Sequence, residues 1–217
     1  MDINNANVTK FLSALKNMGI DSYVFDKESG STLPNLQKVI KGCEKCGLAK
    51  TRKNVVPGEG DPNARLVFVG EAPGEDEDSK GRPFVGRAGK LLDQLIERVG
   101  LRRDEVYICN VLKCRPPNNR DPEPGEIAAC KDYLTVQLNL IKPKIICTLG
   151  RHAYNTLFGV DEKITRIRGK LTTYHGTMLL PTFHPSYLLR NQTKINEAWE
   201  DMEKLKKLLK SSLTKLF

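Results

Sequence analysis

Four of the six cysteines in this 217-residue chain are placed where thiolates could bind a metal. Cys43 and Cys46 form a Cys-x-x-Cys pair, Cys114 follows a predicted strand, and Cys130 lies in the first turns of a predicted helix. Four thiolates complete the ligand set of a zinc ion or of an iron–sulfur cluster, and the irregular spacing slightly favours the cluster. A thioredoxin-like redox pair is the weakest alternative, because no strand precedes Cys43. The remaining cysteines lie within apolar runs and are expected to be small buried residues, Cys109 and Cys147.

Two polar side chains stand at or near the ends of apolar runs. His184 follows the run "TMLLPTF" and precedes a proline that restricts its backbone, which makes it the best candidate for a catalytic group. Asn110 interrupts the apolar segment "YICNVL", where an unpaired amide would be costly. Because an amide both donates and accepts, Asn110 suits reading the edge of a nucleobase or tying two backbone segments together.

The glycine-rich segment "VGEAPGEDEDSKGRPFVGRAG" directly follows an apolar run. Its acidic stretch, residues 75–78, offers oxygen ligands that suit magnesium or manganese, although a solvated acidic loop is the favoured interpretation. Glu71 stands apart because it comes straight after the apolar run. Phe84 offers a ring that could stack on a planar ligand or anchor the loop. The segment matches neither common phosphate-binding glycine pattern.

The elements that must position these residues form a regular alternation. Apolar runs of strand length alternate with segments of helical period, and the last of these segments is a lysine-rich C-terminal helix. This pattern predicts a three-layer α/β/α sandwich with a central four-stranded parallel sheet. Ligands bind such sheets outside the carboxyl ends of the strands, so four loops should build one cleft. The side chains expected at that edge are Glu71, Asn110, His152 and His184.

The totals restrict the class of protein. A formal net charge of +9 and a pI of about 9.2 suggest an anionic partner, with nucleic acid as the leading candidate and a merely basic surface as the alternative. No run approaches the roughly 18 apolar residues of a membrane span. The N-terminus lacks the pattern of a secretory signal, so we expect a cytoplasmic protein, nucleoid-associated in a prokaryote.

The sequence also suggests how the chain is divided. Residues 1–40 contain one amphipathic pattern and then a polar stretch, which predicts an N-terminal extension or linker. Residues 41–217 are expected to form a single domain. The pattern in the extension is formed by Val8, Phe11, Leu12, Leu15 and Met18.

Several long motifs carry a family resemblance. The segments "GEAPGEDED", "GRPFVGRAG", "NVLKCRPPNNRDP" and "FHPSYLLR" resemble the family-4 uracil-DNA glycosylases, the iron–sulfur branch of the uracil-DNA glycosylase superfamily, over about residues 40 to 210. The resemblance implies hydrolysis of the N-glycosidic bond of uracil in DNA, leaving an abasic site without a lyase step. It also implies a [4Fe-4S] cluster on the matching positions Cys43, Cys46, Cys114 and Cys130.

The resemblance further implies a pocket for a flipped-out base. Phe84 would stack on the uracil, Asn110 would bind its edge, and His184 would stabilise the charge that develops on it. Residues Glu71, Ala72 and Gly74 would line the pocket. The best-known branch of the superfamily has a water-positioning aspartate in the first motif, where this chain has Ala72. Two carboxylates are therefore the candidates for activating water, Glu71 and Glu77.

Contacts to DNA are expected from two segments. In "HPSYLLR", one of Leu188 and Leu189 would wedge into the base stack, and Ser186 and Arg190 would bind phosphates. A basic cluster beside Cys114 would belong to a DNA-binding loop that the metal braces, with Lys113, Arg115 and Arg120 as its members.

The expected partner is DNA containing uracil, single- or double-stranded. We expect a monomer without membrane contact, and no sliding-clamp or other repair-protein partner can be named from the sequence. Three alternatives are kept: a related glycosylase acting on hypoxanthine or other deaminated bases, a metal-dependent nuclease, and a non-catalytic nucleic-acid-binding module.

Overall fold

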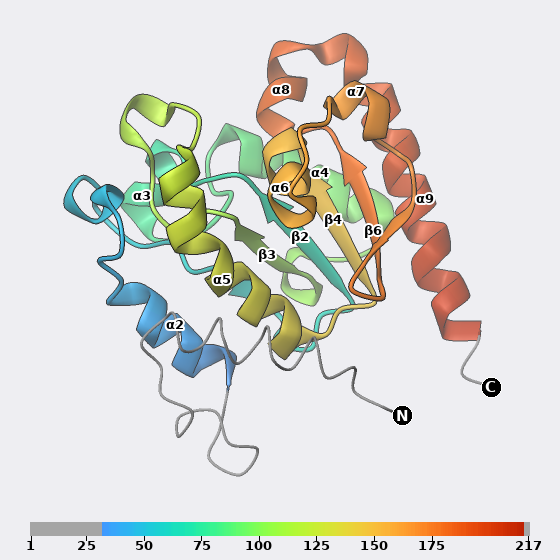
Figure 1. The fold of residues 1–217 in the computed structure, drawn as a ribbon. Helices are drawn as coiled ribbons and strands as arrows, with labels where there is room; N and C mark the ends of the chain where they lie inside the picture. Colours follow the sequence, from blue (N-terminus) through green and yellow to red (C-terminus); the bar gives the residue numbers. More distant parts are fainter. Residues whose placement is uncertain (1–31, 215–217) are drawn as a thin grey trace.

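A mixed six-stranded sheet lies at the centre of the computed structural model, which describes residues 32–214 and the side chains of residues 32–211 (Figure 1). The strand order is β1-β3-β2-β4-β6-β5. The four inner strands are parallel and correspond to the four predicted ones: β3 (Tyr107–Asn110), β2 (Leu66–Gly70), β4 (Ile145–Leu149) and β6 (Thr177–Thr182).

Two short antiparallel strands extend the sheet beyond the predicted four. β1 (Glu59–Gly60) pairs with β3, and β5 (Thr172–Tyr174) pairs with β6. Both are partly exposed, so they lack the continuous apolar run by which buried strands are recognised. The predicted α/β class is confirmed, and the sheet is larger than predicted.

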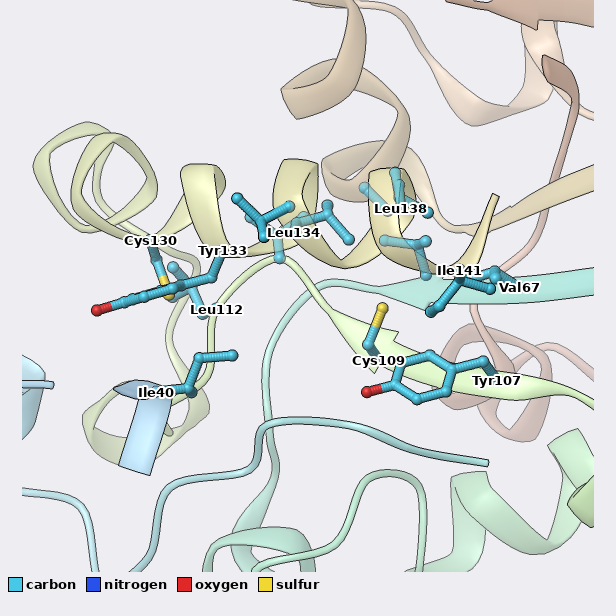
Figure 2. Packing of buried hydrophobic residues seen from close by; sticks show 14 of the residues in the cluster. Ile40, Val67, Tyr107, Cys109, Leu112, Cys130, Tyr133, Leu134, Leu138 and Ile141 are labelled. Atoms are coloured by element: carbon cyan, nitrogen blue, oxygen red, sulfur yellow. The ribbon is translucent and has the colours of Figure 1, made fainter. Parts of the chain in front are cut away.

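One face of the sheet packs against three helices. These are α2 (Leu33–Lys41), α5 (Pro124–Ile141) and α6 (Arg151–Phe158). Figure 2 shows side chains of α5 lying over those of β2 and β3, with Ile40 of α2 beside them. Val67 and Val69 supply the apolar contacts of β2 on this face.

The opposite face packs against α4 (Arg87–Val99), α8 (Pro185–Arg190) and α9 (Ile195–Thr214). Leu66 and Phe68 of β2 point to this side, because successive residues of a strand alternate between faces. Helices on both faces complete the predicted three layers. Within the described part of the chain, the shorter elements are α3 (Glu75–Lys80), α7 (Ile164–Ile167) and the single 3-10 turns Gly47–Lys50, Arg103–Glu105, Pro117–Asn119 and Gln192–Lys194.

Helix α2 belongs to the folded core although its sequence falls largely in the predicted extension. Leu33, Leu36 and Ile40 are buried against α5, so residues 33–40 are not a free linker. The amphipathic pattern of residues 8–18 lies outside the described residues, and the division of the chain at residue 40 stays a prediction. Within residues 32–214, no helix is long and apolar enough to cross a membrane.

Candidate active site and four-cysteine centre

A cavity of about 510 Å³ opens at the carboxyl ends of the parallel strands. The loops after β2, β3, β4 and β6 all contribute to its wall, which confirms that four distant segments meet at this edge. The site residues predicted from sequence that line it are Glu71, Ala72, Gly74, Glu77, Phe84, Asn110, Arg120, His184, Ser186 and Arg190. His152, also expected at this edge, lines it as well. Four other predicted residues do not line it: Lys113, Arg115, Leu188 and Leu189. The prediction that Lys113 belongs to a basic DNA-facing cluster is wrong, because its side chain is buried and 1% exposed.

The ring of Phe84 is held tightly in this wall. Its backbone adopts φ 50°, a left-handed conformation that is strained for an aromatic residue. A Cβ on Gly89 would lie 1.9 Å from the carbonyl oxygen of Phe84, and one on Gly70 would lie 2.6 Å from the ring. Only glycine at these two positions lets helix α4 and strand β2 approach Phe84 so closely.

Asn110, the last residue of β3, has a side chain that is 1% exposed and lines the cavity. Its Oδ1 receives no hydrogen bond from any residue that the structure describes. A buried amide oxygen without a donor costs free energy unless a ligand supplies one. Asn110 therefore offers the cavity a free acceptor.

His184 begins α8 and is fixed by Ser186. Its Nδ1 accepts the backbone N–H of Ser186 at 3.1 Å and lies 2.7 Å from the Ser186 hydroxyl. Because Nδ1 is an acceptor, the neutral ring carries its proton on Nε2. Burial lowers the pKa of His184 to about 4, with smaller contributions from Arg190 and His152. At neutral pH this imidazole is therefore an uncharged Nε2–H donor.

Glu71 lies in a polar group that includes residues not singled out from the sequence. His152 Nε2 is 3.8 Å from a Glu71 oxygen and 3.3 Å from Asp121 Oδ2, which Arg151 also contacts at 3.2 Å. Burial raises the pKa of Glu71, although the charges of His152 and Arg151 oppose this and that of Asp121 reinforces it. Asp121 was not predicted from the sequence, because it lies in an irregular loop that has no periodic pattern.

Glu77 has its oxygens occupied by backbone amides. Oε1 accepts the N–H groups of Val85 at 2.8 Å and Gly86 at 2.9 Å, and Oε2 accepts that of Gly74 at 3.1 Å. Asp78 is buried and accepts backbone N–H groups from residues 53 and 54. The interpretation of residues 75–78 as a solvated acidic loop is therefore wrong for these two carboxylates, which bind backbone amides and hold neighbouring segments together.

The predicted DNA-contacting side chains differ in their freedom. Leu188 is 1% exposed in the core, whereas its neighbour Leu189 is 42% exposed. Arg120 forms two hydrogen bonds with the Glu126 carboxylate, at 2.9 and 2.6 Å. Arg115 donates to Asn119, so of these cations Arg190 is the one on the cavity wall with an exposed side chain and no ion pair within the described residues.

The four predicted ligand cysteines gather around a second, smaller cavity. Cys114 and Cys130 are buried, and Cys43 and Cys46 are partly buried. Figure 2 shows Cys130 of α5 beside Tyr133 of the same helix, and the Tyr133 hydroxyl hydrogen-bonds with Cys43. The predicted burial of the other two cysteines in strands is confirmed.

Donors already point at two of these sulfurs. Arg52 Nη1 donates to Cys114 Sγ at 3.3 Å, and the backbone N–H of Lys113 donates to Cys130 Sγ at 3.3 Å. Burial raises the pKa of the Cys130 thiol to about 12, so a thiolate here needs a positive centre beside it. Burial also lowers the pKa of Lys113, and nearby cysteines oppose that shift. The donor set suits a thiolate-bound metal centre.

The spacing of the sulfurs bears on which centre fits. Among the described residues, one group of three metal-capable side chains has its ligand atoms within 4.8 Å of one another. It consists of Glu71, Asp121 and His152 and contains no cysteine. Around a single zinc ion at 2.3 Å, tetrahedral geometry places sulfurs about 3.8 Å apart. No three of these four sulfurs lie within 4.8 Å of one another, so they are not gathered at the spacing of a mononuclear zinc site.

Comparisons with known proteins agree with this geometry. The Uracil DNA glycosylase superfamily model matches residues 57–203. A type-4 uracil-DNA glycosylase of Thermotoga maritima is 52% identical over 79% of this chain and 91% of its own length. Those of Sulfurisphaera tokodaii and Archaeoglobus fulgidus are 48% and 44% identical, over 82% and 86% of this chain and 84% and 98% of their own lengths. The chain belongs to the type-4 branch of the uracil-DNA glycosylase superfamily.

Proposed function

We propose that the protein is a monofunctional uracil-DNA glycosylase of base-excision repair, which flips uracil out of DNA and hydrolyses its N-glycosidic bond to leave an abasic site. The observation that carries the proposal is the neutral imidazole of His184, held with its proton on Nε2 in the same cavity as Phe84 and the free acceptor of Asn110. Family membership supports the same reaction.

Base recognition follows from the two buried side chains. The ring of Phe84 stacks on the flipped base. Asn110 Oδ1 accepts the N3–H of uracil, a proton that neutral cytosine lacks at that position, and the amide of the same side chain donates to O4. The backbone of Ala72 and Gly74 closes the pocket. A wrong base leaves Oδ1 buried and unpaired, and that penalty supplies the discrimination.

Bond cleavage separates charge between the two halves of the nucleotide. As the C1′–N1 bond breaks, the electron pair moves to the uracil and the sugar becomes cationic. His184 donates its Nε2–H to the uracil oxygen and remains uncharged, so it stabilises the leaving anion without having to take up a proton first. Water then adds to C1′, and Glu71 accepts the proton that this water loses. The raised pKa of Glu71 makes it a better base than an exposed carboxylate.

Glu77 acts differently in this proposal. Its three amide contacts fix the loop that carries both Gly74 and Phe84, so we assign it a positioning rather than a proton-transfer role.

A [4Fe-4S] cluster on Cys43, Cys46, Cys114 and Cys130 completes the proposal. Buried thiols, donors aimed at sulfur, and sulfurs not gathered at the spacing of a mononuclear zinc site support it. When bound, such a cluster serves as a structural cross-link. This chain's own residues there flank the loop between Cys114 and Cys130, from which Arg120 reaches the wall of the cavity.

On the DNA side, Leu189 is the proposed wedge and Arg190 the proposed phosphate contact, with Ser186 reserved for orienting His184. The protein acts on DNA, and we propose that it does so as a monomer. Strand preference is left to experiment.

One assay tests the function. The protein is incubated with a uracil-containing oligonucleotide in chelator, and half of each sample is then treated with alkali. Cleavage only after alkali is expected. Cleavage before alkali would indicate a lyase or nuclease, and no cleavage would point to a binding module. A matched hypoxanthine oligonucleotide distinguishes the related glycosylases, and the same strand with thymine is the control.

A further inference from the structure

Lys113 is a buried lysine without a carboxylate partner. Its side chain is 1% exposed, and Nζ donates to the carbonyl oxygen of Asn110 at 2.7 Å and to Gln137 Oε1 at 2.6 Å. Both acceptors are neutral. Among residues 32–211, no Asp or Glu oxygen forms an ion pair with it. A buried ammonium without an opposite charge is strongly destabilising, so the position requires an explanation.

The polar groups around Lys113 give that explanation. Its backbone N–H donates to Cys130 Sγ at 3.3 Å, and the next residue is Cys114. A second cation, Arg52, donates to Cys114 from the other side. Four thiolates around an iron–sulfur core leave the centre anionic. The ammonium of Lys113 bonds to Asn110 and Gln137, and the thiols of Cys130 and Cys114 lie within electrostatic range of it. Lys113 and Arg52 are therefore two cations near the cysteines, one of them buried, and they suit such an anion.

We propose that Lys113 is the buried counter-charge of the four-cysteine centre, and that it stabilises the bound cluster electrostatically. The inference rests on the iron–sulfur cluster of the proposed function. The same residue links the centre to base recognition, because its ammonium also fixes the carbonyl of Asn110. Lys113 is thus a positioning residue and an electrostatic one.

Gln137 provides a matched control. It accepts from Lys113, and its Nε2 donates to the Pro57 carbonyl at 2.7 Å and to the Tyr107 hydroxyl at 3.2 Å. Lys113→Met and Gln137→Met both delete the same hydrogen bond in the same buried site. Only Lys113→Met removes the charge. Gln137→Glu keeps the lysine but pairs its ammonium with a carboxylate, which neutralises the charge. This variant tests the proposal if Lys113→Met does not fold.

The test uses the full chain with its cluster loaded. Two quantities are measured: the rate of iron release to a chelator, and the reduction potential of the cluster by voltammetry. Lys113→Met should release iron about 10- to 100-fold faster, the usual effect of losing a group that supports the ligands. Its potential should become more negative, because reduction adds an electron to a centre that has lost a nearby positive charge. Gln137→Glu should shift both in the same direction, and Gln137→Met should keep the wild-type potential.

The outcomes separate the two proposals. Equal release rates and potentials in Lys113→Met and wild type would overturn the counter-charge while leaving the glycosylase assignment intact. A potential shift in Gln137→Met as large as that in Lys113→Met would also overturn it, since a lost hydrogen bond would then be sufficient. A wild-type protein that binds no iron after reconstitution would overturn both the cluster and its counter-charge, and uracil excision measured in parallel reports separately on the activity.

Discussion

The ring of Phe84 lies 5.6 Å from the imidazole of His184, measured between centroids, with the two planes tilted by 36°. The two residues come from opposite ends of the domain sequence and meet because β2 and β6 both flank β4. In the proposed mechanism Phe84 holds the base and His184 stabilises it as it leaves, so the distance between the two rings would set the position of the reacting bond.

Replacing His184 with Asn should lower the rate of uracil excision about 10²- to 10³-fold, the usual loss when one preorganised donor is removed. Binding of DNA containing an abasic site should change little. Single-turnover kinetics and a gel-shift assay measure the two effects. An equal loss in both would mean that His184 serves DNA binding rather than catalysis.

The pH dependence of excision should report Glu71. A general base must be ionised, and the pKa of Glu71 is raised by burial, so the rate should increase with pH through that raised pKa. The pKa of His184 is about 4, so its own titration does not change the rate near neutral pH. In Glu71→Gln the rate should fall about 10²- to 10⁴-fold and the acid limb should disappear. If the rate of Glu71→Gln still falls at acidic pH, another group is responsible for that pH dependence.

Stability should also depend on pH through His184. Its pKa is about 4 in the folded protein and near 6.5 when unfolded, so the unfolded chain binds the proton more readily between these values. Stability is therefore full above pH 6.5 and falls as pH decreases toward 4, by on the order of 3 kcal/mol from this residue. Urea unfolding at pH 7 and pH 4.5 measures the fall, which should be smaller in His184→Asn.

Gly70→Ala should impair folding and catalysis together. The added Cβ would lie 2.3 Å from Asn110 Oδ1 and 2.6 Å from the Phe84 ring, so it would push both side chains out of the positions they hold in the pocket. Gly125→Ala is the matched control, because that glycine lies in α5 with nothing within 4 Å of the added atom. The control should be neutral or slightly stabilising, by up to about 1 kcal/mol. Thermal melts and excision rates compare the two variants. A fully active Gly70→Ala would show that Asn110 and Phe84 can shift to accommodate the added methyl group.

The adjacent leucines of α8 should separate core from DNA contact. Leu188→Ala should cost about 2–5 kcal/mol of stability, as for other buried leucines. Leu189→Ala should leave the melting temperature nearly unchanged and slow excision from duplex more than from single-stranded DNA, because only a stacked base needs a wedge. Equal slowing on both substrates would remove Leu189 from that role.

The sequence was most informative where burial is continuous. The four inner strands, helices α4, α5, α6 and α9, and the meeting of four loops at one edge could all be predicted, because apolar runs and helical periods reveal them. β1 and β5 could not, since two or three partly exposed residues carry no pattern. Asp121 was missed because a contact made by an irregular loop leaves no periodic trace.

Other details depended on side-chain packing. Nothing in "SYLLR" tells which leucine is buried, and only the structure separates Leu188 from Leu189. The amide contacts of Glu77 were likewise hidden, because a carboxylate that binds backbone is identical in sequence to one that binds water. The place of α2 in the core was obscured by the polar stretch that precedes it.

The left-handed backbone of Phe84 also matters for the thermodynamics of substrate binding. Such a conformation costs on the order of 1–3 kcal/mol, and here the packing of Gly89 and the Glu77 amide contacts impose it before any DNA arrives. Folding therefore bears the entropy of ordering this ring, and binding of the base does not. The free energy of binding the flipped nucleotide can then offset the cost of unstacking it from the duplex. With an unconstrained loop, the same binding energy would also have to offset the cost of ordering the loop.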